Sequence, residues 1–318
     1  MELLYWLSGL RTEAGNVFFM IVTYLGDEAV ALALMLTVFW CIDKKMGYYM
    51  IYGTVFGLLC NQFLKSLFAI PRPWIRDPEF QAVAAAKATA GGYSFPSGHT
   101  ATATAVYGSM ARYRKEKAFR GICLALIALV GFSRMYLGVH TPADVGVSLF
   151  VGTVLIFVLY PVVLRSGEAG TFWRLQAVFL VCVLALFAFL TIKGLPEDPS
   201  LTEEELVHGA ASAMKAAWQI LGMGLGILVS HAYDHFHRPF PTRAVWWAQI
   251  LKAVMGLLLV VAVKEGLKLP LSVLFGGHPA ATAVRYFLVV TTAGLLWPLT
   301  FGFFGRLGRR EERTAPKE

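Results

Sequence analysis

Charge is scarce in this chain of 318 residues, since only 15% are Asp, Glu, Lys or Arg whereas 57% are hydrophobic. Soluble domains carry about 25% charged residues, so this composition argues against a soluble protein. The turn signals that would separate strands at regular intervals are also absent, which argues against a buried α/β core. Several apolar runs of about 18 or more residues instead predict an all-α, polytopic membrane helical bundle.

Cysteine is rare and unpatterned. Four cysteines lie singly in apolar segments, so we predict neither disulfides nor a cysteine metal site: Cys41, Cys60, Cys123 and Cys182. The N-terminal segment lacks the basic region and cleavage site of a signal peptide, and we expect a short interfacial helix there. No basic patch interleaved with aromatic residues suggests base stacking, so the net charge of +8 is attributed to membrane topology and no nucleic-acid partner is predicted.

The apolar runs predict about nine spans. They fall near 17–41, 47–68, 97–111, 121–139, 143–164, 173–192, 214–231, 249–267 and 281–304. Asp27 and Glu28 lie inside the first run and either cap a helix or face a polar cavity, because a lipid-facing position is costly.

Basic residues mark one side of the predicted bundle. They concentrate at 43–45, at 112–120 and in the C-terminal tail, whereas the acidic stretch 196–205 falls on the other side. The excess of Lys and Arg in cytoplasmic loops predicts an outside N-terminus and a cytoplasmic C-terminus. Residues 1–192 hold the polar motifs, and 193–318 are expected to form an additional three-span region.

This topology brings three polar clusters to the outer membrane face. They are Lys65 with Arg72, then Ser97, Gly98 and His99, and finally Arg134, His140 and Asp144. The three cations suit a tetrahedral anion, since guanidinium groups offer forked donors to phosphate oxygens. Pro96-Ser97-Gly98 is expected to form the first turn of a helix, whose amides and serine hydroxyl add donors.

Two histidines within such a site provide a nucleophile and a proton donor for phosphoryl transfer. Asp144 follows His140 by four residues and stacks beside it on a helix, where it can hold one ring tautomer. The residues alone do not assign the two histidines. Asp144 is the only carboxylate in the clusters, so no metal site and no cofactor are predicted.

The motifs K65-x6-R72-P73, P96-S97-G98-H99 and S133-R134-x5-H140-x3-D144 resemble the signature of the type 2 phosphatidic acid phosphatase (lipid phosphatase/haloperoxidase) superfamily. The resemblance implies that His140 is the nucleophile, that Asp144 orients it and that His99 is the general acid. It further implies phosphate binding by five residues, which are Lys65, Arg72, Ser97, Gly98 and Arg134. The predicted layout is similar to the glucose-6-phosphatase and sphingosine-phosphate phosphatase branches.

The sequence therefore predicts a metal-independent phosphatase of the cell membrane, acting on a lipid phosphate at the extracytoplasmic face. A phosphotransferase, a phosphatase of a soluble sugar phosphate, and an anion or lipid transporter stay open as alternatives. The bilayer is the expected partner, and a homodimer is left open.

Three further polar features have weaker interpretations. His231 and His235 have helical metal-ligand spacing, but we expect a solvated span end or a headgroup contact instead. Lys264 and His278 are expected to be solvated, with substrate contact as the alternative. Ser133 either contacts phosphate or bonds locally.

Overall fold

The computed structural model describes residues 1–88, 90–193, 202–237 and 239–307, and within these every regular element is helical. The first part comprises α1 (Glu2–Gly9), α2 (Glu13–Tyr24), α3 (Glu28–Thr37), η1 (Val38–Ile42), α4 (Lys44–Phe68), α5 (Pro73–Arg76), α6 (Ala84–Lys87), α7 (Gly98–Ala103), η2 (Thr104–Gly108), α8 (Ser109–Tyr113), α9 (Lys117–Tyr136), α10 (Pro142–Leu164) and α11 (Ala169–Lys193). The remainder comprises α12 (Glu203–Phe236), α13 (Trp246–Gly266), α14 (Lys268–Leu274), α15 (Ala280–Thr291), η3 (Thr292–Leu296), η4 (Pro298–Thr300) and α16 (Phe301–Phe304).

Seven helical segments of the described residues are long and apolar enough to cross a membrane, or eight if the bent pair of α2 with α3–η1 is one span. The sequence predicted nine spans, one more than these eight, and the additional one is the segment 97–111. This segment is helical, but the π-helical turn η2 divides it into the short helices α7 and α8. A polytopic helical bundle is confirmed, while the ninth span and the orientation of the termini stay predictions.

The first predicted span, 17–41, is not one straight helix. The two halves meet at 46°, and the Asp27 carboxylate accepts a 2.8 Å hydrogen bond from the Ala29 amide to cap α3. A Cβ atom added to Gly26 would lie 2.7 Å from the carbonyl oxygen of His99. Glycine at the bend therefore lets the chain pack directly against the start of α7.

Side-chain caps fix where the motif-bearing helices begin. The Thr141 hydroxyl and the Asp144 carboxylate form a reciprocal capping box at the start of α10. The Ser97 hydroxyl caps α7, whose first residue is Gly98. The expected first turn at Pro96-Ser97-Gly98 is thus wrong by two residues, because the serine side chain binds the amide of Thr100 from outside the helix.

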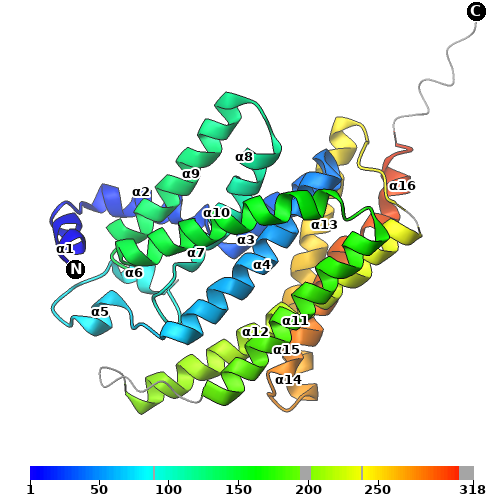
Figure 1. Ribbon diagram of the computed structural model, residues 1–318. Helices are drawn as coiled ribbons and strands as arrows, with labels where there is room; N and C mark the ends of the chain where they lie inside the picture. The colour runs from blue at the N-terminus through cyan, green and yellow to red at the C-terminus, as the bar shows by residue number, and fades with distance from the viewer. Residues whose placement is uncertain (89, 194–201, 238, 308–318) are drawn as a thin grey trace, which may run out of the picture.

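Helices α12 to α16 pack beside the first part of the chain (Figure 1). One buried apolar cluster contains residues from both parts, including Trp40 and Phe301. The Trp40 indole donates a 2.9 Å hydrogen bond to the carbonyl of Ala293. At the other end, the Lys193 ammonium binds the carbonyl of Leu67 at 2.6 Å. Helices α11 and α12 both pack against α4.

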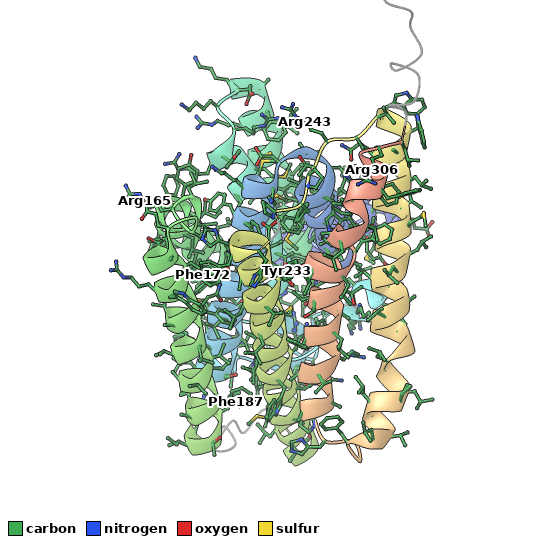
Figure 2. The ribbon with its side chains drawn as sticks, turned by 90° about the vertical axis from the view of Figure 1, so that its right-hand side faces the viewer. Arg165, Phe172, Phe187, Tyr233, Arg243 and Arg306 are labelled. Carbon is green, nitrogen blue, oxygen red and sulfur yellow. The ribbon has the colours of Figure 1, made fainter. Side chains whose placement is uncertain are left out.

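Basic side chains gather toward one end of the bundle. Figure 2 shows Arg165, Arg243 and Arg306 toward the upper end, whereas Phe187 lies toward the lower end. The lower end is also where Lys193 meets the last turn of α4. Parts of the predicted basic and acidic loops, namely 194–201, Arg238 and the tail from 308, lie outside the described residues.

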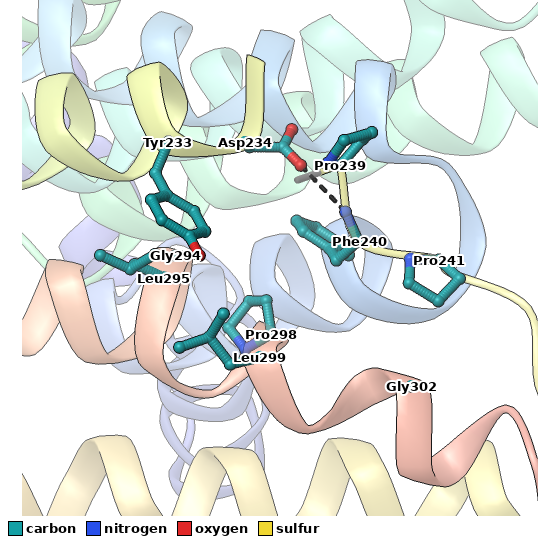
Figure 3. A pocket seen from close by; sticks show the side chains of 10 residues that line it. All are labelled: Tyr233, Asp234, Pro239, Phe240, Pro241, Gly294, Leu295, Pro298, Leu299 and Gly302. Carbon is teal, nitrogen blue, oxygen red and sulfur yellow. Dashed lines mark hydrogen bonds between the residues drawn. The ribbon is translucent and has the colours of Figure 1, made fainter. Parts of the chain in front are cut away.

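A buried polar network occupies the basic end. Asp234 accepts hydrogen bonds from the Lys44 ammonium at 2.8 Å and from the Phe240 amide at 3.2 Å, beside a cavity of about 150 Å³ (Figure 3). His231 is only 4% exposed, and its Nδ1 lies 2.8 Å from the Tyr52 hydroxyl. The expectation of a solvated His231 is wrong, because α4 and α11 pack over it.

Candidate active site

Arg134 lies near the end of α9 and is completely buried. One guanidinium nitrogen, Nη1, donates a 2.8 Å hydrogen bond to the Thr23 hydroxyl from α2. The other two, Nε and Nη2, have no hydrogen-bond partner. A buried charge with two unpaired donors is costly to fold, so this arrangement favours an anionic ligand that would pair with both.

Arg72 precedes α5 and is 4% exposed. Its guanidinium donates to the carbonyls of Gly91 at 2.7 Å, Gly92 at 2.9 Å and Val139 at 3.1 Å. The Nη1 atom also lies 2.9 Å from Nε2 of His140. These contacts hold the loop before α7 and the loop before α10 around one cation.

His140 lies in the turn between α9 and α10 and is 1% exposed. Its Nδ1 lies 3.3 Å from the Asp144 carboxylate, and the ring contact with Arg72 requires a lone pair on Nε2. The proton therefore belongs on Nδ1, which leaves an unprotonated lone pair on Nε2. Burial and the charges of Arg72, Arg134 and Lys65 hold the pKa of His140 well below its ordinary value, so the ring stays neutral.

The geometry of the turn depends on a glycine and on backbone contacts. Gly138 has φ of +77°, a left-handed conformation that suits glycine. The Arg134 carbonyl then accepts from the amides of Val139 at 3.1 Å and His140 at 3.3 Å. Arg134 thus orients His140 through its main chain while its side chain faces the cavity.

The Asp144 carboxylate receives more partners than the sequence indicated. Its Oδ2 accepts a 2.5 Å hydrogen bond from the buried Ser94 hydroxyl and a 2.8 Å bond from the Thr141 amide. These two contacts fix the carboxylate against His140. The Thr-x-x-Asp capping pattern was visible in the sequence, whereas nothing local marked Ser94, which lies 50 residues away.

Lys65, Gly98 and His99 complete the group. Lys65 is in the last turn of α4, and its ammonium donates a 2.5 Å hydrogen bond to the Tyr93 carbonyl. Gly98 and His99 form the first turn of α7 and line the same cavity.

The buried Ser97 hydroxyl accepts from the amide and hydroxyl of Thr100, so its own proton is free to be donated. Ser133 bonds locally to the Val130 carbonyl at 2.7 Å.

A cavity of about 440 Å³ joins these groups, and both parts of the chain line it. Asp27 and Glu28 both line it at the start of α3, and Asp27 also caps this helix. Gln219 on α12 and Lys264 on α13 contribute from the C-terminal part. Lys264 lines the cavity, so its expected role as a solvated span end was incomplete. His278 is exposed, as expected. The C-terminal helices form a wall of the site, although they carry no motif.

Every residue of the three predicted clusters thus converges at one end of the bundle, and no group of three or more metal-ligand side chains occurs among the described residues. Such a bundle, with three cations and two histidines about one cavity, defines a membrane protein built to hold and transfer phosphate. Comparisons with known proteins identify it further. Residues 47–168 match the PAP2 superfamily, and residues 214–310 match the transmembrane extension of PAP2 superfamily phosphatases.

Curated relatives agree with these matches. Sphingosine-1-phosphate phosphatase 2 of Mus musculus is 24% identical over 81% of this chain and 74% of its own length. Undecaprenyl-diphosphatase BcrC of Bacillus subtilis is 29% identical over 50% of this chain and 81% of its own. The crystal structure of Aquifex aeolicus LpxE, 26% identical, covers 49% of this chain and 92% of that chain, with a TM-score of 0.45.

The chain belongs to the PAP2 superfamily and is a membrane-integral phosphatase of that superfamily. The resemblance inferred from the three motifs is therefore confirmed. The roles of individual site residues stay predictions.

Proposed function

We propose that the chain hydrolyses the phosphate monoester of a lipid at the extracytoplasmic face of the cell membrane, through a phosphohistidine at His140 and without a metal ion. The observation that carries the proposal is the buried Arg134, whose Nε and Nη2 lack partners beside the cavity that both histidines line. Phosphate oxygens match these paired donors. Arg72 and Lys65 add two further cations to the same cavity.

In the proposed reaction, Nε2 of His140 attacks phosphorus while the bond to the lipid oxygen breaks. Arg72 moves its hydrogen bond from Nε2 to a phosphate oxygen. The charge of the bound phosphate dianion offsets the neighbouring cations, so that His99 takes up a proton on substrate binding and gives it to the leaving oxygen. Water then attacks the phosphohistidine as His99 takes a proton from it. Inorganic phosphate and neutral His140 result. The cations stabilise the charge on the equatorial oxygens throughout, as in other phosphoryl transfers.

The proposed membrane face rests on the placement of charge. Lys44 and Lys65 lie 21 residues apart on α4, which corresponds to about 32 Å, the thickness of a hydrocarbon core. The Lys44 end carries the basic loops and the Lys65 end carries the site. The positive-inside rule then places the site outside, with the C-terminus in the cytoplasm.

The lipid substrate is supported by the relatives and by the site's position. The relatives' names include a sphingosine-1-phosphate phosphatase and a lipid phosphate phosphatase. A cavity at the ends of membrane helices suits a headgroup that arrives laterally. We propose residues 1–192 as the catalytic core and 193–318 as a three-span region that closes its cavity.

Phosphate release by the purified protein tests the proposal. The panel contains sphingosine 1-phosphate, phosphatidate, undecaprenyl diphosphate and glucose 6-phosphate, each with EDTA. We expect EDTA-resistant release from a lipid monoester, and inhibition by vanadate, which mimics five-coordinate phosphorus. One oxygen-18 atom per released phosphate in oxygen-18 water would distinguish hydrolysis from transfer to another acceptor. Strict metal dependence or a preference for glucose 6-phosphate would contradict the proposal.

The role of His99 has its own test. His99→Gln is expected to slow hydrolysis of alkyl phosphates by about 10²- to 10⁴-fold, because an alkoxide needs a proton to leave. The loss should be much smaller for p-nitrophenyl phosphate, since nitrophenolate leaves unprotonated. The measurement is kcat for both substrates in wild type and variant. Equal losses would show that His99 does not act as the general acid.

A further inference from the structure

Helix α2 packs along the end of α9 that carries Arg134 (Figure 1). At its start the Thr12 amide donates a 3.2 Å hydrogen bond to the Tyr136 hydroxyl. Further along, the ring centroid of Phe19 lies 4.3 Å from that of Tyr136. The last contact of this face is between Thr23 and Arg134. The positions that meet α9 recur every three or four residues and therefore share one face of the helix: Thr12, Gly15, Phe19 and Thr23.

The contact with Thr23 determines which edge of the Arg134 guanidinium is free. Thr23 is completely buried, and its hydroxyl accepts a 2.8 Å hydrogen bond from Nη1. In a planar guanidinium Nη1 lies on the side of Cδ, whereas Nε–H and one N–H of Nη2 point in parallel from the other side. Nε and Nη2 are the two nitrogens without a partner. Thr23 therefore binds the group through Nη1 and leaves free the edge that suits two oxygens of one phosphate.

Arg134 needs such an anchor because its neighbours repel it. Lys65, Arg72 and Arg134 line one cavity, and like charges at short range destabilise one another. An arginine side chain also has several rotatable bonds, so without an anchor it has many orientations. A fixed acceptor on α2 opposes both effects before an anion binds. Donors that are already oriented are what the transition state of phosphoryl transfer requires.

The bend after α2 is part of the same contact region. Thr23 lies in the last turn of α2, and α3 continues at an angle of 46°. Between them, Gly26 packs against the carbonyl of His99, and Asp27 lines the catalytic cavity. The bent pair of α2 and α3 thus contacts residues of two motifs, although it lies outside both ranges that match the superfamily.

We propose that Thr23 is a positioning residue of the phosphate site. Its hydroxyl holds Arg134 so that the edge formed by Nε and Nη2 receives two oxygens of the phosphoryl group. The proposal rests on the proposed phosphatase function. Through Thr23 the first helical pair contributes a fourth element to the site, in addition to the three motifs.

Three substitutions at one position and one control test the inference. Thr23→Val keeps the shape of the side chain and removes the acceptor, whereas Thr23→Ser keeps the acceptor. Thr23→Cys, whose sulfur is only a weak acceptor, replaces Thr23→Val if that variant does not yield folded protein. Thr37→Val is the matched control, because the Thr37 hydroxyl bonds to the Ala33 carbonyl of its own helix at 2.7 Å.

The readouts are hydrolysis and the dissociation constant of vanadate. We expect Thr23→Val to lower kcat/KM roughly 10- to 100-fold, the usual effect of losing a hydrogen bond to a charged group. The loss should be equal for a lipid monophosphate and for p-nitrophenyl phosphate, because Arg134 binds the phosphoryl group and not the leaving group. Vanadate affinity should weaken by a similar factor. Thr23→Ser should restore both quantities to within about threefold of wild type, and Thr37→Val should match wild type.

A double-mutant comparison shows whether Thr23 acts through Arg134. In an Arg134→Met background, Thr23→Val should cause no further loss of kcat/KM beyond about twofold, because the group that it positions is gone. Losses that multiply in the double variant would overturn the inference, since Thr23 would then act independently of Arg134. A merely structural role for Thr23 predicts this second result.

Vanadate binding separates the inference from the proposed function, because it needs no turnover. Absent hydrolysis, together with vanadate binding that weakens in Thr23→Val and recovers in Thr23→Ser, would refute the phosphatase proposal and support the positioning role. Normal hydrolysis with wild-type vanadate affinity in Thr23→Val and Thr23→Cys would overturn the inference and retain the phosphatase.

Discussion

His140→Gln is expected to abolish phosphate release, with a loss of at least roughly 10⁴-fold in kcat. Glutamine retains a polar group of similar reach but has no nucleophilic ring nitrogen. In the structure Nε2 lies 2.9 Å from Arg72, and Nδ1 faces the Asp144 carboxylate at 3.3 Å. This is the tautomer that a nucleophile requires.

Two measurements check this result. Steady-state release gives the rate, and rapid quenching with a phosphorus-32 lipid gives the protein-bound phosphate, which should be present in wild type and absent in His140→Gln. His237→Ala is the control, because that histidine is exposed and lies toward the opposite end of the bundle. Wild-type rates in His140→Gln, or labelled phosphate that persists in it, would refute the covalent role.

Arg134→Met is expected to lower kcat/KM by about 10²- to 10³-fold, the usual cost of losing one transition-state donor group. It is also expected to leave the ligand-free protein as stable as wild type or more stable. The reason is that Arg134 is fully buried with Nε and Nη2 unpaired. Methionine occupies similar space without a desolvated charge.

Thermal unfolding with and without vanadate measures the second expectation. Vanadate should raise the Tm of wild type by clearly more than that of Arg134→Met, because the variant lacks two of the donors that bind the anion. Arg120→Met is the matched control, since Arg120 lies on the same helix 14 residues away, near its other end. A large drop in the Tm of ligand-free Arg134→Met would indicate a structural role instead.

Sequence information was sufficient where the relevant contacts are local. Apolar runs between polar loops predicted the bundle, since a helix in lipid must satisfy its own backbone. The four-residue spacing of His140 and Asp144 predicted their contact, although His140 lies in the turn before α10 and not on the helix itself. Asp27 was also interpretable, as acids at a helix start cap it.

The predictions that were wrong or incomplete concern contacts between distant segments. The Thr23 partner of Arg134 is 111 residues away, and the Ser94 partner of Asp144 is 50 residues away. His231 was expected in solvent, but it pairs with Tyr52, 179 residues earlier. No periodicity connects such residues, since helix packing alone decides which of them meet.

By itself the sequence determined the chemistry of this protein. Its motifs specify three cations, two histidines and one carboxylate, and its hydropathy brings them to one membrane face. The tertiary structure alone decided the space in which that chemistry occurs. Gln219 belongs to no motif, yet it lines the cavity that holds the two histidines. Val260 likewise belongs to no motif, and it lines a second, apolar cavity between the two parts of the chain. A cavity is formed by the surfaces of several helices at once, and so its shape depends on how they pack together.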